Sequence, residues 1–335
     1  MATEAVRADR QRQSDMAVYT EVTDEALTAF VAGYDIGEVL SCKGIAEGIE
    51  NSNYLLTTSA GHFILTLYEK RVKAEDLPFF LGLLEHLAAK GVPCPVPVKG
   101  KDGKALRRLA SRPAAIVTFL DGMWPRRITV EHCAQLGEAL AKMHVAGADF
   151  PMRRVNSLSV AGWRPLFNAS LDHADEVRPG LADEIGRELD ALEAAWPSDL
   201  PSGVIHADLF PDNVFFRREK LSGLIDFYFA CTDAFAYDLA ICMNAWCFEV
   251  GNSFNVTKAR RMLTAYSKVR KFSDKELDAL PLLARGSAVR FLLTRLYDWV
   301  HTPKDALVTP KDPLEYLAKL RFHRGVKGPG AYGLK

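Results

Sequence analysis

Apolar runs in the first third of the chain predict a small β-rich part. Stretches at 53–58 and 63–68 flank a Ser-Ala-Gly turn, which is the pattern of a β-hairpin, and a glycine-containing loop precedes them. Another apolar run at 114–120 predicts a strand that ends before a Gly turn. Two helices are expected beside these strands, one starting at Thr23 and one over 76–90.

Helical spacing dominates after residue 123. Apolar residues recur at intervals of three and four over five segments: 129–145, 166–173, 181–196, 235–249 and 257–268. Ser273 with Glu276 forms a capping box that predicts the start of a further helix. Pro281 lies inside that pattern, so we expect it to kink or divide the helix. Between these helices, only 203–226 has the pattern of a short β block.

These patterns predict an α+β, two-lobed protein with a small β-rich N-lobe and a larger helical C-lobe. The order of parts follows the pattern changes: a flexible tail over 1–15, the N-lobe over 16–118, a hinge over 119–123, the C-lobe over 124–322 and a Gly-rich flexible tail over 323–335.

Composition excludes several classes of protein. The 335 residues include 42 Lys plus Arg and 42 Asp plus Glu, so the basic excess typical of nucleic-acid binders is absent. No apolar run reaches the length of a membrane span, and the first residues lack the apolar centre of a signal peptide. The six cysteines form no C-x-x-C pair. We therefore expect reduced thiols and a cytoplasmic location.

The segment around HADLFPDN carries the candidate chemistry. A hydrophobic strand ends at His206-Ala-Asp208, and a Pro-containing turn leads to Asn213, five positions after Asp208. An apolar strand then ends at Asp226, eighteen positions after Asp208. We expect these strands to bring Asp208, Asn213 and Asp226 to one edge of a small β unit.

Three oxygen-bearing side chains at one edge fit phosphoryl transfer. Asn213 and Asp226 offer the hard oxygen ligands that suit Mg²⁺ shared with substrate phosphates. Asp208 is then free to orient a hydroxyl and take its proton, which is the division of labour in kinases. The alternative is a chance coincidence, which the added Asp226 makes rare. His206 and Asp238 are interpreted as structural support for the loop around Asp208.

The motif HADLFPDN, together with IDFY, resembles the aminoglycoside-phosphotransferase and choline-kinase superfamily, which has a protein-kinase-like fold. Further segments, over about residues 16 to 320, narrow the resemblance to the bacterial homoserine kinases of this fold. These segments are GIAEGIENSNY, FILTLYE, DLPFF, DGKALRRL, GLIDFYFAC, YDLAI and VRFLLTRL. The resemblance implies ATP-dependent, direct in-line phosphorylation of the hydroxyl of L-homoserine, a step of threonine biosynthesis, with Mg²⁺ as cofactor.

The glycine-punctuated segment before the first hairpin predicts a lid over the nucleotide phosphates. Gly48, Asn51 and Asn53 supply donors there, although an ordinary turn has the same composition. The resemblance implies that groups at Thr118, Phe119 and Leu120 bind adenine.

Thr66 is a departure from this class of kinase. It stands where a Lys or Arg usually holds the α- and β-phosphates, and its hydroxyl carries no charge. Lys43 and Lys70 are the alternative cations.

The acceptor site needs both signs of charge, because homoserine carries an ammonium and a carboxylate beside its hydroxyl. Arg290 and Arg295 share a predicted helix and fit a carboxylate, with Arg290 preferred. Four further candidates follow Asp226 in the chain: Tyr228, Asp233, Trp246 and Glu249. For each of these side chains, packing or surface exposure is the alternative role.

Two other functions stay open on the sequence. One is a kinase for another small alcohol, such as choline, an aminoglycoside, methylthioribose or hydroxylysine. The arginines after Asp226 favour an acceptor that bears a carboxylate. The other is a non-catalytic nucleotide-binding module, which the missing Lys prompts and the intact Asp208, Asn213 and Asp226 oppose. The expected partners are ATP and a small amino-acid alcohol, with no nucleic acid and no membrane.

Overall fold

The computed structural model describes residues 20–45, 51–69, 73–302 and 309–334. The chain divides into two compact units, one ending at Asp121 and the other beginning at Gly122. This boundary falls within the range 119–123. In its described residues the first unit holds a sheet and two α-helices, and the second unit is mainly helical, so the predicted α+β class is confirmed.

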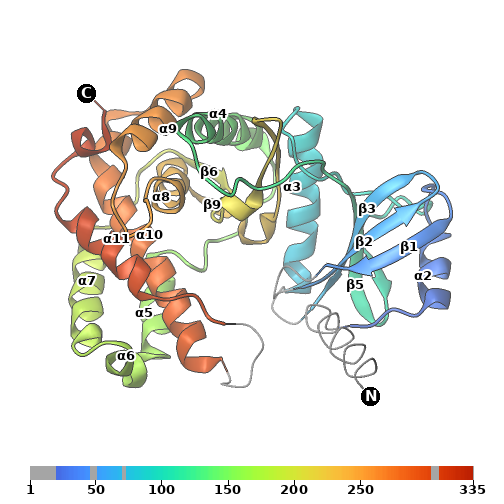
Figure 1. Ribbon diagram of the computed structural model, residues 1–335, viewed down its shortest axis with the longest axis horizontal. Helices are drawn as coiled ribbons and strands as arrows, with labels where there is room; N and C mark the ends of the chain where they lie inside the picture. The colour runs from blue at the N-terminus through green and yellow to red at the C-terminus, as the bar shows by residue number, and fades with distance from the viewer. Residues whose placement is uncertain (1–19, 46–50, 70–72, 303–308, 335) are drawn as a thin grey trace, which may run out of the picture. The chain divides into compact units, whose positions relative to one another are not determined.

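The N-terminal unit is built on an antiparallel five-stranded sheet with the order β1-β2-β3-β5-β4 (Figure 1). Its elements are α2 (Asp24–Val31), β1 (Val39–Gly44), β2 (Asn51–Thr58), β3 (Gly61–Tyr68), α3 (Leu77–Ala89), β4 (Arg107–Leu109) and β5 (Arg112–Thr118). The predicted hairpin is β2–β3, and Thr23 caps α2 as expected.

The two faces of this sheet differ in chemistry. One face is covered by α2, where Leu27 and Phe30 join a buried cluster with Leu56 and Leu65 of the strands. Because side chains alternate along a strand, the opposite face carries the other register. On that face Asn53 of β2 lies directly across from Thr66 of β3.

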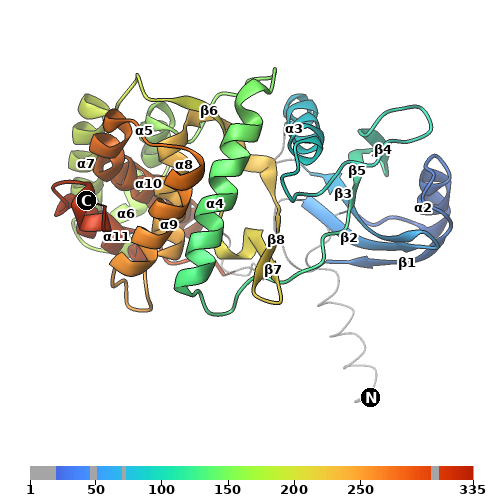
Figure 2. The same cartoon turned by 90° about the horizontal axis from the view of Figure 1, so that it is seen from above.

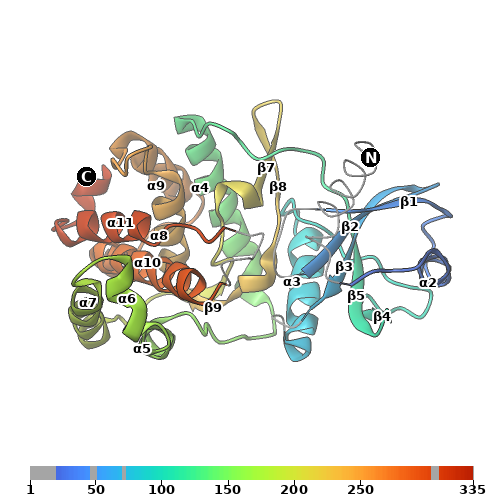
Figure 3. The same cartoon turned by 60° about the horizontal axis from the view of Figure 1, so that its bottom comes forward.

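The C-terminal unit surrounds a few short strands with helices. Its elements are α4 (Val130–Ala146), α5 (Val160–Asn168), α6 (Leu171–Val177), α7 (Leu181–Ala195), β6 (Ser202–Ile205), β7 (Val214–Arg217), β8 (Lys220–Leu224), β9 (Cys231–Ala234), α8 (Phe235–Trp246), α9 (Val256–Val269), α10 (Asp274–His301) and α11 (Leu314–Arg324). Helices α4 and α9 lie side by side, and α10 packs against both α8 and α11 (Figures 2 and 3). The fully buried residues of α8 make this helix the centre of the unit.

One helix prediction is wrong, and one of the two outcomes expected at Pro281 is excluded. The helix expected over 166–173 is wrong, because α5 ends at Asn168 and α6 begins at Leu171. The stripe that forms α5 is Trp163 with Phe167, which lie one turn apart and are both buried. Pro281 does not divide α10, which runs unbroken from Asp274 to His301 and buries much of its length.

The flexible tail expected over 323–335 is also wrong for its described residues. His323 and Tyr332 are both fully buried, and their side chains share a hydrogen bond of 2.8 Å. The glycine content of the segment concealed this aromatic anchor, which packs beside Phe254. The tail expected over 1–15 lies outside the described residues. In the described part of the chain, no helix is both long and apolar enough to cross a bilayer.

Gly137 permits the close approach of α4 and α9. A Cβ atom at this position would clash with the main-chain carbonyl of Met262 on α9. We expect Gly137→Val to lower the free energy of unfolding by about 1–3 kcal/mol, as overpacking usually does. Chemical denaturation of the whole protein, followed by circular dichroism of its helices, measures the change.

Gly186, in the interior of α7, is the matched control because a Cβ atom there meets nothing within 4 Å. Gly186→Ala should raise stability by about 0.5–1 kcal/mol through helix propensity. Equal effects of the two substitutions would contradict the packing argument.

Candidate active site

Backbone hydrogen bonds gather the three predicted catalytic and metal residues at the ends of the short strands. Asp208 follows β6, Asn213 precedes β7, and Asp226 follows β8. Between them, Ile225 donates its N–H to the carbonyl of Asn213 at 3.0 Å and shares a hydrogen bond with His206 Nε2 through its own carbonyl at 3.0 Å. Ile225 therefore binds His206 before Asp208 and Asn213 after it, and Asp226 is the next residue in the chain.

Asn213 is bound directly to Asp208. Its side-chain Nδ2 donates to the Asp208 carbonyl at 2.8 Å and to Asp208 Oδ2 at 3.3 Å. These two bonds fix the amide and leave its Oδ1 without a donor among the described residues. Asp208 is half-buried and Asp226 is exposed, so both carboxylates have access to a ligand.

Two residues of this cluster adopt a strained backbone. Ala207 has φ +64° and Asp226 has φ +62°, a left-handed conformation that residues other than glycine rarely adopt. Ala207 is held on both sides. Its N–H donates to Asp238 Oδ1 at 2.8 Å, and its carbonyl accepts a hydrogen bond of 2.6 Å from Arg290 Nη1.

Asp238 also binds the neighbouring residue and a buried histidine. Its Oδ2 accepts the N–H of His206 at 2.8 Å and lies 3.0 Å from His144 Nε2. Burial alone would raise the pKa of Asp238, but the hydrogen bond with His144 and further interactions with His144 and His206 hold that pKa below its usual value. A charged, fully buried carboxylate thus organises the backbone that precedes Asp208. The sequence singled out Asp238 and His206 for this support but missed His144, although a histidine on the apolar stripe of α4 was a visible signal.

The donor set fits a magnesium ion that completes its coordination with phosphates. The Asn213 Oδ1 and a carboxylate of Asp226 are hard oxygen ligands, and Mg²⁺ usually binds one or two such protein groups together with substrate oxygens. Among the described residues, no three His, Cys, Asp or Glu side chains form a metal site of their own. Such a closed protein cage would not be expected for a metal shared with a nucleotide.

In the N-terminal unit, two of the residues predicted to bind nucleotide are buried in the sheet, and a third, Asn53, stays accessible. Thr66 is buried and its Oγ1 donates to Asn53 Oδ1 at 2.8 Å. Asn51 is buried as well, and its Oδ1 accepts the N–H of Glu69 at 3.3 Å. Asn53 is half-buried and therefore accessible, and the hydrogen bond from Thr66 orients its side chain. Gly48 and Lys70 lie outside the described residues, and Lys43 is exposed on β1.

The segment after β5 offers free backbone groups. Thr118 is committed, because its N–H donates to Val96 and its hydroxyl accepts the N–H of Val96. Phe119 is exposed and Leu120 is half-buried, and their main-chain groups form no hydrogen bond with a described residue.

Two acceptor predictions need correction. Arg290 is only 1% exposed, and its Nη1 is used by the Ala207 carbonyl, so it supports the loop instead of facing a substrate. Trp246 is fully buried and donates its indole N–H to the Leu209 carbonyl at 2.7 Å. Both side chains hold the catalytic loop from beneath.

The other acceptor predictions keep partial access. Arg295 pairs with Glu315 at 2.6 Å, and Glu249 pairs with Lys258 at 2.6 Å. Asp233 accepts a hydrogen bond from Asn156 Nδ2 at 2.7 Å. Tyr228 is half-buried in the turn after Asp226.

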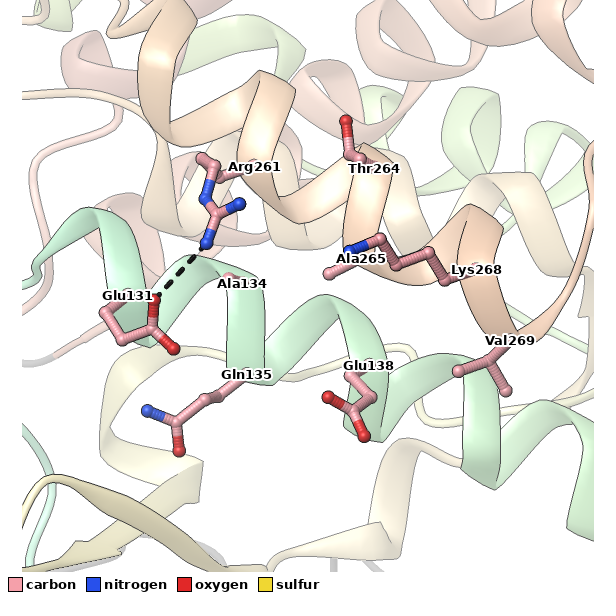
Figure 4. A pocket seen from close by; sticks show the side chains of 9 residues that line it. All are labelled: Glu131, Ala134, Gln135, Glu138, Arg261, Thr264, Ala265, Lys268 and Val269. Atoms are coloured by element: carbon pink, nitrogen blue, oxygen red, sulfur yellow. Dashed lines mark hydrogen bonds and ion pairs between the residues drawn. The ribbon is translucent and has the colours of Figure 1, made fainter.

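A groove between α4 and α9 is separate from this cluster (Figure 4). It is spanned by an ion pair between Arg261 and Glu131 at 3.4 Å and is lined on the α9 side by Lys268. None of the predicted catalytic or metal residues lines it.

A comparison with protein families identifies the family to which the chain belongs. Residues 41–272 match the phosphotransferase enzyme family, and the match includes Asp208, Asn213 and Asp226. The chain belongs to this phosphotransferase family. Similar curated relatives are a homoserine kinase of Rhodospirillum rubrum, 69% identical over 95% of this chain and 99% of the relative, and a homoserine kinase of Paramagnetospirillum magneticum, 66% identical over 96% and 100%.

Solved structures show that the phosphotransferase fold is shared at low identity. Amicoumacin kinase hAmiN aligns with a TM-score of 0.66 at 14% identity, over 95% of this chain and 94% of that chain. A choline kinase from Cryptosporidium parvum aligns with a TM-score of 0.66 at 14% identity, over 90% and 94%. The protein-kinase-like fold expected from the sequence is confirmed.

The buried histidine of the loop makes stability depend on pH. Burial away from water lowers the pKa of His206 to about 4, whereas the unfolded chain titrates near 6.5. Unfolding therefore takes up a proton at acidic pH. The stability present above pH ~6.5 should fall by roughly 3 kcal/mol as the pH drops toward 4. Urea denaturation across this range measures the slope, and His206→Asn should reduce it by about one proton. A slope unchanged by the substitution would contradict the assignment.

Proposed function

We propose that this chain is a homoserine kinase, which transfers the γ-phosphoryl group of ATP to the side-chain hydroxyl of L-homoserine. The product is O-phospho-L-homoserine, an intermediate of threonine biosynthesis. The observation that carries the proposal is the 69% identity to a homoserine kinase over 95% of the chain. The hydrogen-bonded pair of Asp208 and Asn213 beside Asp226 supports it, because it supplies the groups that phosphoryl transfer requires.

Asp208 is the proposed base. Its carboxylate accepts the hydroxyl proton of homoserine and orients the oxygen toward the γ-phosphorus, so transfer is direct and needs no phosphoenzyme. Asn213 keeps the carboxylate in place through its Nδ2. Ala207 fixes where the loop turns, because both of its main-chain polar groups are held. Proton transfer to a positioned group contributes about 10²–10⁴-fold to a rate.

Asn213 and Asp226 are the residues that would hold Mg²⁺. When bound, the ion neutralises charge on the phosphate oxygens. On the nucleotide side, we propose that Asn53, oriented by Thr66, contacts the phosphates and that the main chain of Phe119 and Leu120 contacts adenine.

An ADP-release assay with purified protein separates the candidate functions. Homoserine should stimulate ADP release from Mg-ATP, and choline or an aminoglycoside should not. Stimulation by choline alone would move the chain to a different acceptor class, and stimulation by no alcohol would favour a nucleotide-binding module.

Asp208→Asn should lower kcat by about 10²–10⁴-fold, because the amide cannot take a proton. ATP binding, measured by calorimetry, should persist in this variant. Asp226→Ala should instead weaken binding of Mg-ATP. Asp212→Asn is the matched control, since Asp212 is exposed in the same loop and has no charged partner among the described residues. Unchanged turnover in Asp208→Asn would refute the base assignment.

Arg290→Met tests the corrected role of Arg290. Removing the bond to the Ala207 carbonyl leaves a buried acceptor unsatisfied at a cost of about 1–3 kcal/mol, so kcat should fall roughly 10–100-fold. The KM values for ATP and homoserine should stay within about twofold, and Arg290→Lys should recover part of kcat. A large rise in the homoserine KM with kcat retained would return Arg290 to the acceptor site.

A further inference from the structure

The basic side chains around the catalytic loop are almost all committed to protein partners. Arg290 binds the Ala207 carbonyl, and Arg295 binds Glu315 together with the Asp312 carbonyl. Lys319 also pairs with Glu315, at 2.6 Å. Each of these three side chains is already bound to protein atoms.

Among the described residues beside this loop, Lys311 is the exception. It is exposed and forms no ion pair with any residue that the structure describes. Its Nζ lies 5.7 Å from the centre of the Phe210 ring. Phe210 belongs to the catalytic loop itself, because its N–H donates to the carbonyl of Asp208 at 2.8 Å.

The Phe210 ring is a rigid platform under Lys311. It packs edge-on against Phe291 of α10 at 4.8 Å and contacts Tyr316 of α11 at 6.5 Å. Phe210 therefore links Lys311 to Asp208, because its ring contacts Lys311 and its N–H binds the Asp208 carbonyl. Tyr316 is itself close enough to feel the charge of Asp208, since burial raises the pKa of its hydroxyl and the Asp208 carboxylate adds to this effect.

A cavity of about 430 Å³ has room for a small amino acid and adjoins the chain segment that follows Lys311. It is lined by the turn at 249–252 and by Asp312, Leu314 and Glu315. The Glu249 and Glu315 carboxylates are paired with Lys258 and with Arg295. Asp312 forms no ion pair with a described residue. Lys311 and Asp312 thus carry opposite charges at consecutive positions, and neither forms an ion pair with a described residue. This pair of charges suits an acceptor that bears an ammonium and a carboxylate on one carbon atom.

We propose that Lys311 binds the α-carboxylate of the acceptor and thereby selects an amino-acid alcohol over a simple amino alcohol. This assignment rests on the proposed function, because it presumes that the hydroxyl of the acceptor lies at Asp208. The loss of one charge-assisted hydrogen bond predicts the size of the effect.

The test compares homoserine with 3-aminopropan-1-ol, which is homoserine without its carboxylate. Lys311→Ala should raise the KM for homoserine about 10–100-fold and leave the KM for ATP unchanged. For 3-aminopropan-1-ol, the KM should be the same in both proteins. Where its turnover is too slow, its Ki as a competitor of homoserine replaces the KM. Lys311→Arg should retain most of the affinity for homoserine.

Lys268→Ala is the matched control, because Lys268 is an exposed lysine on the α4–α9 groove. It should leave all constants unchanged. An equal loss for both alcohols in Lys311→Ala, a rise in the ATP KM, or no change for homoserine would each overturn the role of Lys311. Failure of the wild-type protein to phosphorylate homoserine would instead refute the proposed function, so the two failures are distinguishable.

Discussion

The buried carboxylate of Asp238 is the constraint on which the catalytic loop depends. It accepts the N–H groups of two successive residues, His206 and Ala207, immediately before Asp208. Ala207 adopts a left-handed conformation, which costs about 1–2 kcal/mol for a residue with a Cβ. Such strain persists only where the surroundings over-determine it. Asp238 from one side and Arg290 from the other provide that restraint, and the direction in which Asp208 leaves the strand follows from it.

A chain of buried polar contacts ties this constraint to the helical core. Asp238 on α8 binds His144 on α4, whose Nδ1 lies 2.8 Å from the hydroxyl of Tyr266 on α9. Arg270 then bonds both Tyr266 and Glu276, the capping residue of α10. Four helices thus contribute to one network. Because every member is paired, the network specifies a single arrangement of these helices, which a purely apolar core would define less sharply.

Sequence reasoning worked best where the signal is local. The hairpin of β2 and β3, the capping box of Ser273 with Glu276 and most helices follow from periodicity and caps, which act within a few residues. The grouping of Asp208, Asn213 and Asp226 was also predictable, because short strands joined by tight turns leave few arrangements. The tail beyond 323 was not, since one buried tyrosine decided its place.

The acceptor side shows why the remaining predictions failed. An arginine on an amphipathic pattern has the same sequence signal whether it faces a ligand or braces a loop, and only burial and partners distinguish the two roles. Arg290 matched the expected charge, yet it is fully buried and its Nη1 binds the Ala207 carbonyl. Lys311 matched no pattern, because its proposed role rests on its contact with Phe210, and these two residues are about a hundred positions apart in the chain. The proposed charge selection at this site thus depends on which cations stay unpaired once the helices have packed, and the sequence alone does not show this.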